Sequence, residues 1–448
     1  MLTINTKQDI VPSTDTICKM LTASNQLNGM YFDLDRMLEY HFYYRNEAGR
    51  VLQLLYKYIY PNDPANAYIT KGDIIGLINQ FNVGYYFKKT AGGDISLDSE
   101  SVEAAIASGM LSKELGIIVK NYAYAISCNS KVGQFGTIIK DGYEVTNELS
   151  CENHRMIRID PIWVAQNTHR FATQAPAVQN IVRECQDVLT VPKGYIKCDA
   201  DSGQIEPRIT YSTIIKDPVI QKCIRDYNDA YFGLLYYNQM PEELWRSHSL
   251  DFTVPEVNDE MKANRQKLKT MGNAVLYGSS DTKNGDALTA NYIKRIGNHP
   301  MRIAYVRECT DKIMRGDYTF YTAFGEPVDV RNATNATGKY ATASEDAKAK
   351  HFIRSAFNVA MQGTAAGLMK IALDRQNKFI LHNNLKSYII ASVHDAIKTA
   401  IHEDEFDKWK DEFAQFPSYQ VDDWIPIYSD AEFGPHRVNP VFKDSLRF

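Results

Sequence analysis

The chain has 448 residues, and its 50 Lys and Arg side chains nearly balance 54 Asp and Glu, which gives a formal net charge of −4 at pH 7. This length allows two or three domains or one large lobed domain. A content of 44% hydrophobic and 23% charged residues excludes a disordered chain, a collagen and a coiled coil, and seven cysteines without a C-x-x-C pair argue against a zinc ribbon or a disulfide framework.

The first third of the chain is predicted to be mostly helical after a polar start. Residues 1–28 are polar and poorly periodic, which predicts an N-terminal arm. From Gly29 to about Leu115, apolar residues recur at three- and four-residue spacing, which is typical of amphipathic helices. The stretch KKTAGGDISLDSES (88–101) is rich in turn formers and predicts a loop within this region.

The rest of the chain alternates β-rich and helical patterns. The segment GYIKC (194–198) predicts a strand that runs into DADSGQIEPRI (199–209), and residues 255–280 and 345–375 predict long helices. The segment KSYIIASVHDAIKTAIH (386–402) predicts a hairpin whose two strands meet at His394–Asp395. A strand, a long helical insert and then a hairpin indicate an α+β lobe with a helical subdomain inserted into it.

Two carboxylates would lie where predicted strands end. Asp201 follows the strand and Asp395 sits at the hairpin tip, although a single carboxylate at a turn is usually a turn former. Two carboxylates from separate strands are costly to bring together unless a cation lies between them, and paired Mg²⁺ ions would serve phosphoryl transfer. Asp199 competes with Asp201 because side chains two apart on a strand share a face. Position alone does not decide between these two aspartates.

Two helical segments carry polar side chains at four-residue spacing. Such a stripe is either a solvated helix face or a face that binds phosphates and bases. The small residues from Gly363 to Gly367 would let the second helix pack closely against a neighbour, or let nucleic acid approach its backbone. The first stripe consists of Arg265, Lys269, Asn273 and Tyr277, and the second of Arg354, Asn358 and Gln362.

Taken together and in this order, these segments resemble the polymerase domain of family A DNA polymerases, the DNA polymerase I family. Residues 199–209 resemble the motif D-Y-S-Q-I-E-L-R, which makes Asp201 rather than Asp199 the metal-binding aspartate. Residues 265–278 resemble R-x-x-x-K-x-x-x-F-G-x-x-Y-G, residues 358–373 resemble N-x-P-I-Q-G-T-A-A-D-I-I-K-x-A-M, and VHDAI (393–397) resembles V-H-D-E. Weaker matches occur at 29–35, 167–181 and 425–434, so the resemblance covers roughly residues 29–440.

The resemblance implies an α+β fold of the right-hand polymerase type, with an antiparallel-sheet palm, helical fingers and a helical thumb. The expected divisions are an N-terminal arm (1–28), a thumb (29–150), a first part of the palm (151–216), fingers (217–350) and a second part of the palm (351–448).

The resemblance also implies a template-directed DNA polymerase that adds dNTPs to a primer 3′-hydroxyl by two-metal nucleotidyl transfer. Asp201 and Asp395 would hold two Mg²⁺ ions, for which Mn²⁺ could substitute, and Lys269 would be a proton donor to pyrophosphate. Glu206 would be the steric gate against a ribose 2′-hydroxyl. Residues implied to bind the nucleotide are Arg265, Lys269, Tyr277, Glu206, Asn273, Gln204 and Tyr231. Residues implied to contact primer-template DNA are Arg170, Gln179, Asn180, Arg354, Asn358, Gln362 and His394.

Several positions depart from the family pattern. Asn273 stands where the family has Phe or Tyr, Tyr231 where it often has His, Gly367 where it has Asp, and Ala396 where it has an acid. This divergence is typical of a phage or other mobile-element branch. A single-subunit RNA polymerase and a catalytically silent DNA-binding accessory protein remain alternatives; Glu206 argues against the first, and both metal aspartates argue against the second.

The sequence also leads to expectations about partner proteins and cellular location. Only 28 residues precede Gly29, so we expect no proofreading exonuclease in this chain, and a separate exonuclease or processivity factor would be a partner. No apolar run approaches the ~20 residues of a membrane helix and no secretory leader is visible, so we expect no membrane partner and a cytoplasmic location, that of a phage-infected bacterial host. Because the net charge is slightly negative, any DNA contact requires basic groups gathered in one cleft.

Overall fold

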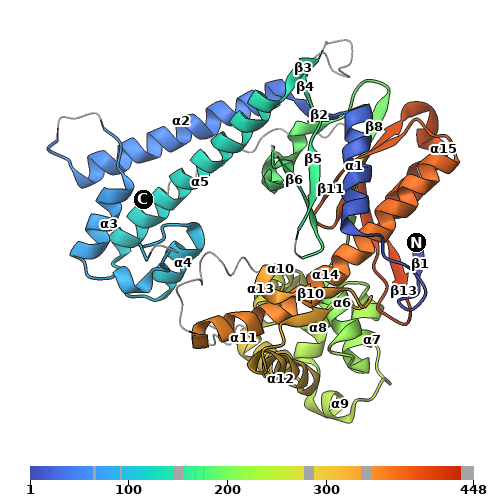
Figure 1. Cartoon of the computed structure of the whole chain (residues 1–448). Coiled ribbons are helices and arrows are strands. Elements are labelled where there is room, and N and C mark those ends of the chain that lie inside the picture. Colours follow the sequence, from blue (N-terminus) through green and yellow to red (C-terminus); the bar gives the residue numbers. More distant parts are fainter. Residues whose placement is uncertain are drawn as a thin grey trace. The chain divides into compact units, whose positions relative to one another are not determined.

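The computed structural model describes residues 1–63, 67–90, 93–145, 155–166, 168–174, 176–276, 287–333 and 345–434 (Figure 1). These residues form two compact units, which are described separately below. Unit 1 combines residues 1–24, 163–172 and 196–434, and the described part of unit 2 combines residues 25–162 and 173–195. Within the described ranges, none of the helices has the length and apolar character needed to cross a membrane.

Unit 2 is built on two long helices that pack along each other, α2 (Leu34–Ile59) and α5 (Lys113–Asp141). Asp33 begins α2 by accepting a hydrogen bond from the Arg36 backbone N–H at 2.9 Å, and the buried Arg36 guanidinium pairs with Asp187 at 2.8 Å. A small sheet has the strand order β3-β4-β2-β7. The remaining elements are β2 (Met30–Asp33), α3 (Lys71–Gln80), η1 (Gly84–Tyr86), α4 (Ser99–Ala107), β3 (Tyr143–Val145), β4 (Met156–Ile159), η3 (Val178–Asn180), η4 (Arg183–Val188) and β7 (Leu189–Thr190).

Unit 1 is centred on a sheet with the strand order β11-β12-β8-β14. Strand β8 (Tyr195–Ser202) is antiparallel to β14 (Ser429–Phe433), and β11 (Tyr388–Val393) is antiparallel to β12 (Ala396–His402). The register places Asp430 opposite Asp201. Because β11 and β12 are almost fully buried, their apolar residues hold the hairpin turn at a fixed place beside β8.

Between β8 and β11 the chain is largely helical, which agrees with the predicted helical insert. Helix α14 is long and packs against α12 and α6. The elements of this insert are α6 (Ile205–Thr213), α7 (Pro218–Tyr227), α8 (Ala230–Gln239), α9 (Glu242–Ser247), α10 (Asp259–Leu276), α11 (Ala287–Tyr292), η5 (Ile293–Gly297), α12 (Pro300–Met314), β9 (Thr319–Tyr321), β10 (Pro327–Asp329), α13 (Val330–Ala333) and α14 (Glu345–His382).

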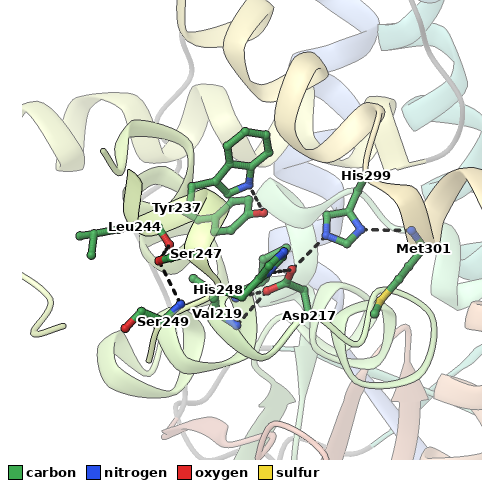
Figure 2. Close-up of polar contacts among 11 residues, drawn as sticks. Asp217, Val219, Tyr237, Leu244, Ser247, His248, Ser249, His299 and Met301 are labelled. Carbon is green, nitrogen blue, oxygen red and sulfur yellow. Dashed lines mark hydrogen bonds and ion pairs between the residues drawn. The ribbon is translucent and has the colours of Figure 1, made fainter. Parts of the chain in front are cut away.

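Buried polar contacts fix the start of this insert. Asp217 begins α7 by accepting from the backbone N–H groups of Val219 and Ile220 at 2.8 and 3.1 Å. Its other oxygen lies 3.1 Å from His299 Nε2 (Figure 2). His299 Nδ1 accepts the Met301 N–H and begins α12, so Nε2 carries the proton and donates it to Asp217. The Asp217 carboxylate therefore links the first turn of α7 to the first turn of α12.

A close backbone approach joins α7 and α8. A Cβ at Gly233 would lie 2.7 Å from the Ile224 Cα, so only glycine fits between these helices. On the same helix, the Tyr237 hydroxyl accepts a hydrogen bond from the Trp245 indole. Gly233 therefore allows α8 to pack closely against α7, although glycine has a low intrinsic helix propensity.

The N-terminal residues, expected to form an arm or cap, contain a strand and a helix. Residues 1–28 form β1 (Leu2–Ile4) and α1 (Thr14–Asn28), and β1 pairs in parallel with β13 (Tyr419–Val421). Ile4, Ile17 and Leu21 are buried, so a few apolar anchors are enough to fold a polar segment onto unit 1. Helix α15 (Glu403–Gln415) also belongs to this unit, whereas β5 (Ile162–Ala165) and β6 (Phe171–Gln174) each have residues in both units.

The predicted strand and hairpin are present. Strand β8 contains the segment 194–198 from its second residue on, and the turn of the β11–β12 hairpin lies at His394–Asp395 as predicted. Both predicted long helices are also present, as α10 and α14. The divisions named thumb, palm and fingers remain predictions.

Candidate functional site

The end of β8 and the turn of the β11–β12 hairpin bring Asp201 and Asp395 to the same edge of the sheet. The Ser202 backbone N–H donates to the Asp395 carbonyl oxygen at 2.9 Å, which fixes one aspartate next to the other. His394 precedes Asp395 with a φ of 55°, in the left-handed region, and its side chain is exposed. The backbone conformation of this tight turn therefore sets the position of Asp395.

The electrostatics of this edge favour a bound cation. Burial raises the pKa of Asp395 to about 6; Arg170 opposes this shift, and the nearby carboxylates of Glu206 and Asp201 add to it. A raised carboxyl pKa means that negative charge is incompletely compensated at this point. A divalent cation would relieve that charge.

The set of candidate metal ligands at this edge is small, and its carboxylates suit Mg²⁺. Among the residues that the structure describes, no group of three or more His, Cys, Asp or Glu side chains is arranged to hold a metal ion. Mg²⁺ commonly takes one or two protein carboxylates and completes its octahedral shell with water and substrate phosphates. Asp201 and Asp395 fit that pattern, in which the substrate supplies part of the shell.

Glu206 and Arg170 form an ion pair beside this edge. Arg170 Nη2 lies 3.0 Å from Glu206 Oε1, with Arg170 from the segment before β6 and Glu206 from the first turn of α6. Both side chains are partly exposed. The ion pair restrains the position of the Glu206 carboxylate.

Asp199 differs from Asp201 in its partner. The buried ammonium of Lys398 on β12 pairs with the Asp199 carboxylate, so Asp199 is already neutralised. This pairing agrees with the motif, which favours Asp201 as the ligand. The sequence reasoning missed Lys398, yet a lysine within the apolar run AIKTAI indicates a buried charge that needs a partner.

The first polar stripe lies on α10. Arg265 contacts Asp229 through Nη2 at 2.7 Å and Nε at 3.1 Å, and Lys269 is exposed one turn later. The buried Tyr231 has its ring centroid 5.5 Å from the Arg265 guanidinium carbon. The Asn273 side chain and the whole of Tyr277 lie outside the described parts of the chain.

The second stripe lies on α14. The buried Oδ1 atom of Asn358 has no hydrogen-bond partner within the described ranges, and Gln362 is partly exposed. The Arg354 side chain is not among the described ones. The amide oxygen of Asn358 is therefore a buried acceptor whose desolvation is not offset, an arrangement more common at functional sites than in a core.

The small residues of α14 pack against the β9–β10 hairpin. A Cβ at Gly363 would lie 2.8 Å from the Thr322 side chain, and one at Gly367 would lie 2.9 Å from the Phe324 ring. Of the two interpretations of this run, close packing against a neighbouring element is the one present in the structure.

The remaining predicted residues fall in two places. Gln179 and Asn180 belong to unit 2, where Gln179 Oε1 accepts from the Thr173 N–H at 3.1 Å and Asn180 is exposed. Gln204 belongs to unit 1, follows β8 with a φ of 57° and donates to Asp229 at 2.6 Å. Asp229, which the sequence reasoning also missed, joins two predicted nucleotide-binding residues.

Comparison with known proteins adds a family and a fold. The sequence matches the family described as DNA polymerase family A over residues 140–436. It is 25% identical to DNA polymerase I of Caldicellulosiruptor bescii over 242 residues, which are 51% of this chain and 26% of that protein. It is also 25% identical to DNA polymerase I of Pseudomonas aeruginosa over 254 residues, 53% of this chain and 25% of that protein. The chain thus spans about a quarter of the length of these curated relatives.

A solved structure resembles most of the chain in its fold. The POL domain of Pol1 from M. smegmatis, in complex with DNA primer-template and dNTP, matches with a TM-score of 0.66 and 18% identity, covering 94% of this chain and 69% of that one. At this identity the likeness concerns the fold, and it confirms the predicted α+β fold class with its antiparallel sheet and helical insert.

Proposed function

The chain belongs to DNA polymerase family A, and from this premise we propose that it is a template-directed DNA polymerase that extends a primer 3′-hydroxyl with dNTPs. The observation that carries this proposal is the pair of aspartates at one sheet edge, joined by the Ser202–Asp395 hydrogen bond. The raised pKa of Asp395 supports it, because the edge carries the excess negative charge that a catalytic cation would neutralise. The activity of the longer relatives is thereby proposed for this shorter chain.

The two aspartates would hold two Mg²⁺ ions, whose chemistry when bound is to activate the primer hydroxyl and to neutralise the leaving pyrophosphate. Asp199 is a less suitable ligand because its carboxylate already pairs with the buried Lys398 ammonium. The carboxylates would be ionised at the working pH once a cation is present, since an adjacent positive charge favours their charged form.

Side chains on α10 would bind the triphosphate. Arg265 offers a planar fork of N–H donors that suits phosphate oxygens, and it is held close to Asp229. Lys269 is exposed one turn further along the same face, where an ammonium could reach a phosphate and donate a proton to pyrophosphate as it leaves. Tyr277 and Asn273 are proposed to meet the base.

Glu206 is proposed to select deoxynucleotides. Arg170 holds its carboxylate at 3.0 Å, so the oxygen atoms would crowd a ribose 2′-hydroxyl rather than move aside. This argument favours a DNA polymerase over a single-subunit RNA polymerase. A comparison of dNTP with NTP incorporation decides between them.

Primer-template contacts are proposed for several further side chains. Asn358 fits this role because its buried Oδ1 has no hydrogen-bond partner in the described ranges, so a base or sugar donor would satisfy it. His394 is exposed at the turn beside Asp395, where a primer terminus would lie. The other proposed contacts are Arg170, Gln179, Asn180, Arg354 and Gln362. A separate exonuclease or processivity factor remains a proposal.

A primer-extension assay with Mg²⁺ and dNTPs tests the function. Asp201→Ala and Asp395→Ala are each expected to lower extension roughly a thousand-fold, because several kcal/mol of charge stabilisation are lost. The matched control is Asp374→Ala, which removes a carboxylate that pairs with Lys378 on α14. Extension that is unchanged in both aspartate variants would overturn the assignment. DNA binding by the wild type without any incorporation would instead support a silent accessory protein.

A further inference from the structure

Asp229 lies between the strand that carries Asp201 and the helix that carries Arg265. Its Oδ1 begins α8 by accepting from the backbone N–H groups of Tyr231 and Phe232 at 2.8 and 2.9 Å. Its Oδ2 accepts from Arg265 Nη2 at 2.7 Å, from Arg265 Nε at 3.1 Å and from Gln204 Nε2 at 2.6 Å. One mostly buried carboxylate thus joins three elements of unit 1.

The geometry of these contacts leaves one side of the Arg265 guanidinium for an anion. Asp229 takes the side that carries Nε and Nη2. The rings of Tyr231 and Phe232 lie with their centroids 5.5 Å from the guanidinium carbon, which restrains the plane of the group. No hydrogen bond to Nη1 is present among the described residues. Because guanidinium donors form a rigid fork, fixing one side orients the other.

Gln204 connects this arrangement to the proposed metal edge. It follows Asp201 by three residues in a left-handed backbone conformation with a φ of 57°. Its side-chain oxygen accepts the Ala230 N–H while its amide donates to Asp229. The side chains of Asp229 and Gln204 therefore connect the Arg265 guanidinium to the end of β8.

We propose that Asp229 is a positioning residue for nucleotide binding: it holds Arg265 by its Nε side so that the opposite side binds a triphosphate oxygen in register with Asp201. This inference rests on the proposed function. A carboxylate beside a triphosphate is tolerated here because the N-terminus of α8 and the Gln204 amide both stabilise its charge. Asp229 acts through Arg265, so its loss should weaken nucleotide binding and leave the chemical step nearly intact.

The test is a double-mutant cycle that measures dATP binding to the chain alone by isothermal titration calorimetry. Asp229→Asn keeps the shape and the capping of α8, since Asn and Asp are equally good helix caps, but turns an amide donor toward Arg265. We expect dATP binding to weaken about tenfold in the wild-type background and not to change in the Arg265→Gln background. Asp229→Ser, another helix-capping change, gives a second measurement if the first variant folds poorly. Asp226→Asn, on α7 and paired with Lys222, is the matched control.

Kinetics provide the second readout. In single-turnover primer extension, Asp229→Asn should raise the apparent dATP dissociation constant about tenfold while the maximal rate stays within about threefold. Equal losses in both backgrounds, tighter binding in the variant, or no dATP binding by the wild type would overturn the inference. Failure of the proposed function looks different, because the wild type would then not extend a primer at all.

Discussion

Replacing Asp395 by Asn is expected to stabilise unit 1 at alkaline pH even though it removes a proposed metal ligand. Burial raises the pKa of this carboxyl group from its ordinary value of 3.8 to about 6. An acid whose pKa is higher in the folded state opposes folding once it ionises. The cost is fully present above the folded pKa and absent below the unfolded pKa. A shift of about two pKa units corresponds to about 3 kcal/mol, and we expect a gain of about 1–3 kcal/mol for the uncharged, equally shaped Asn.

Urea unfolding followed by tryptophan fluorescence measures this effect in unit 1 alone. All four tryptophans, Trp163, Trp245, Trp409 and Trp424, belong to that unit. The variant should unfold at higher urea than the wild type at about pH 8 and at similar urea at about pH 3, which is below the ordinary carboxyl pKa. Adding Mg²⁺ near about pH 8 should narrow the difference, because the cation stabilises only the wild type.

Two results would refute this reasoning. A variant that is no more stable than the wild type near about pH 8 would mean that the Asp395 charge is already compensated. A difference in stability that persists in full at about pH 3 would mean that its origin is not ionisation. Primer extension by the same variant should be lost in either case.

Three further changes have defined outcomes. Gly233→Ala should destabilise unit 1 by about 1–3 kcal/mol in urea unfolding, because the new Cβ would lie 2.7 Å from the Ile224 backbone. Asp217→Asn should destabilise unit 1 at neutral pH, since burial alone would raise the pKa of Asp217 but hydrogen bonds from His299 and backbone N–H groups lower it overall. That loss should begin to shrink as the pH falls below the ordinary carboxyl pKa, and it should disappear once the pH falls below the lowered pKa of Asp217 in the folded protein. Glu206→Ala should reduce the preference for dATP over ATP by about tenfold or more, measured as the ratio of kcat/KM values.

Each of these changes has a comparison that isolates its cause. Gly272→Ala is the control for Gly233, because its Cβ would meet only the hydroxyl end of Tyr292 at 3.3 Å, and an equal loss of stability would contradict the packing argument. If the stability loss of Asp217→Asn does not change with pH, the hydrogen bonds to the ionised carboxylate are not its source. An unaltered sugar preference in Glu206→Ala would leave ribose exclusion to another group.

The sheet edge with its two aspartates could be predicted from local patterns. A β-rich run that leads into DADS and a β-rich run broken at His394–Asp395 are short-range features. The structure has the hairpin where it was predicted, whereas β8 continues to Ser202, so that Asp201 lies within the strand and not after it. The family motif then decided between Asp199 and Asp201, which alternation alone could not separate. The buried Lys398 partner agrees with that decision, since it occupies Asp199.

Other features depend on tertiary contacts that a local sequence pattern does not indicate. Asp229 occurs in an ordinary helix-start sequence, and its contact with Arg265 exists only because α8 and α10 pack together. Likewise, Gly233 resembles a weak point of a helix until the backbone of α7 lies against it. The first 28 residues are polar and poorly periodic and carry no local signal for a strand, yet Ile4 pairs with Val421 near the other end of the chain and is buried.

The pairing of β1 with β13 has a consequence for the order of events during synthesis. Leu2 lies opposite Tyr419, so the first strand of unit 1 has to wait for one of the last to leave the ribosome. The described segments of unit 2 all lie between residues 25 and 195 and are complete much earlier. Because domains fold as their segments emerge, unit 2 should form first. Until β13 appears, Ile4 lacks the strand with which it pairs, and its apolar side chain lacks its native burial.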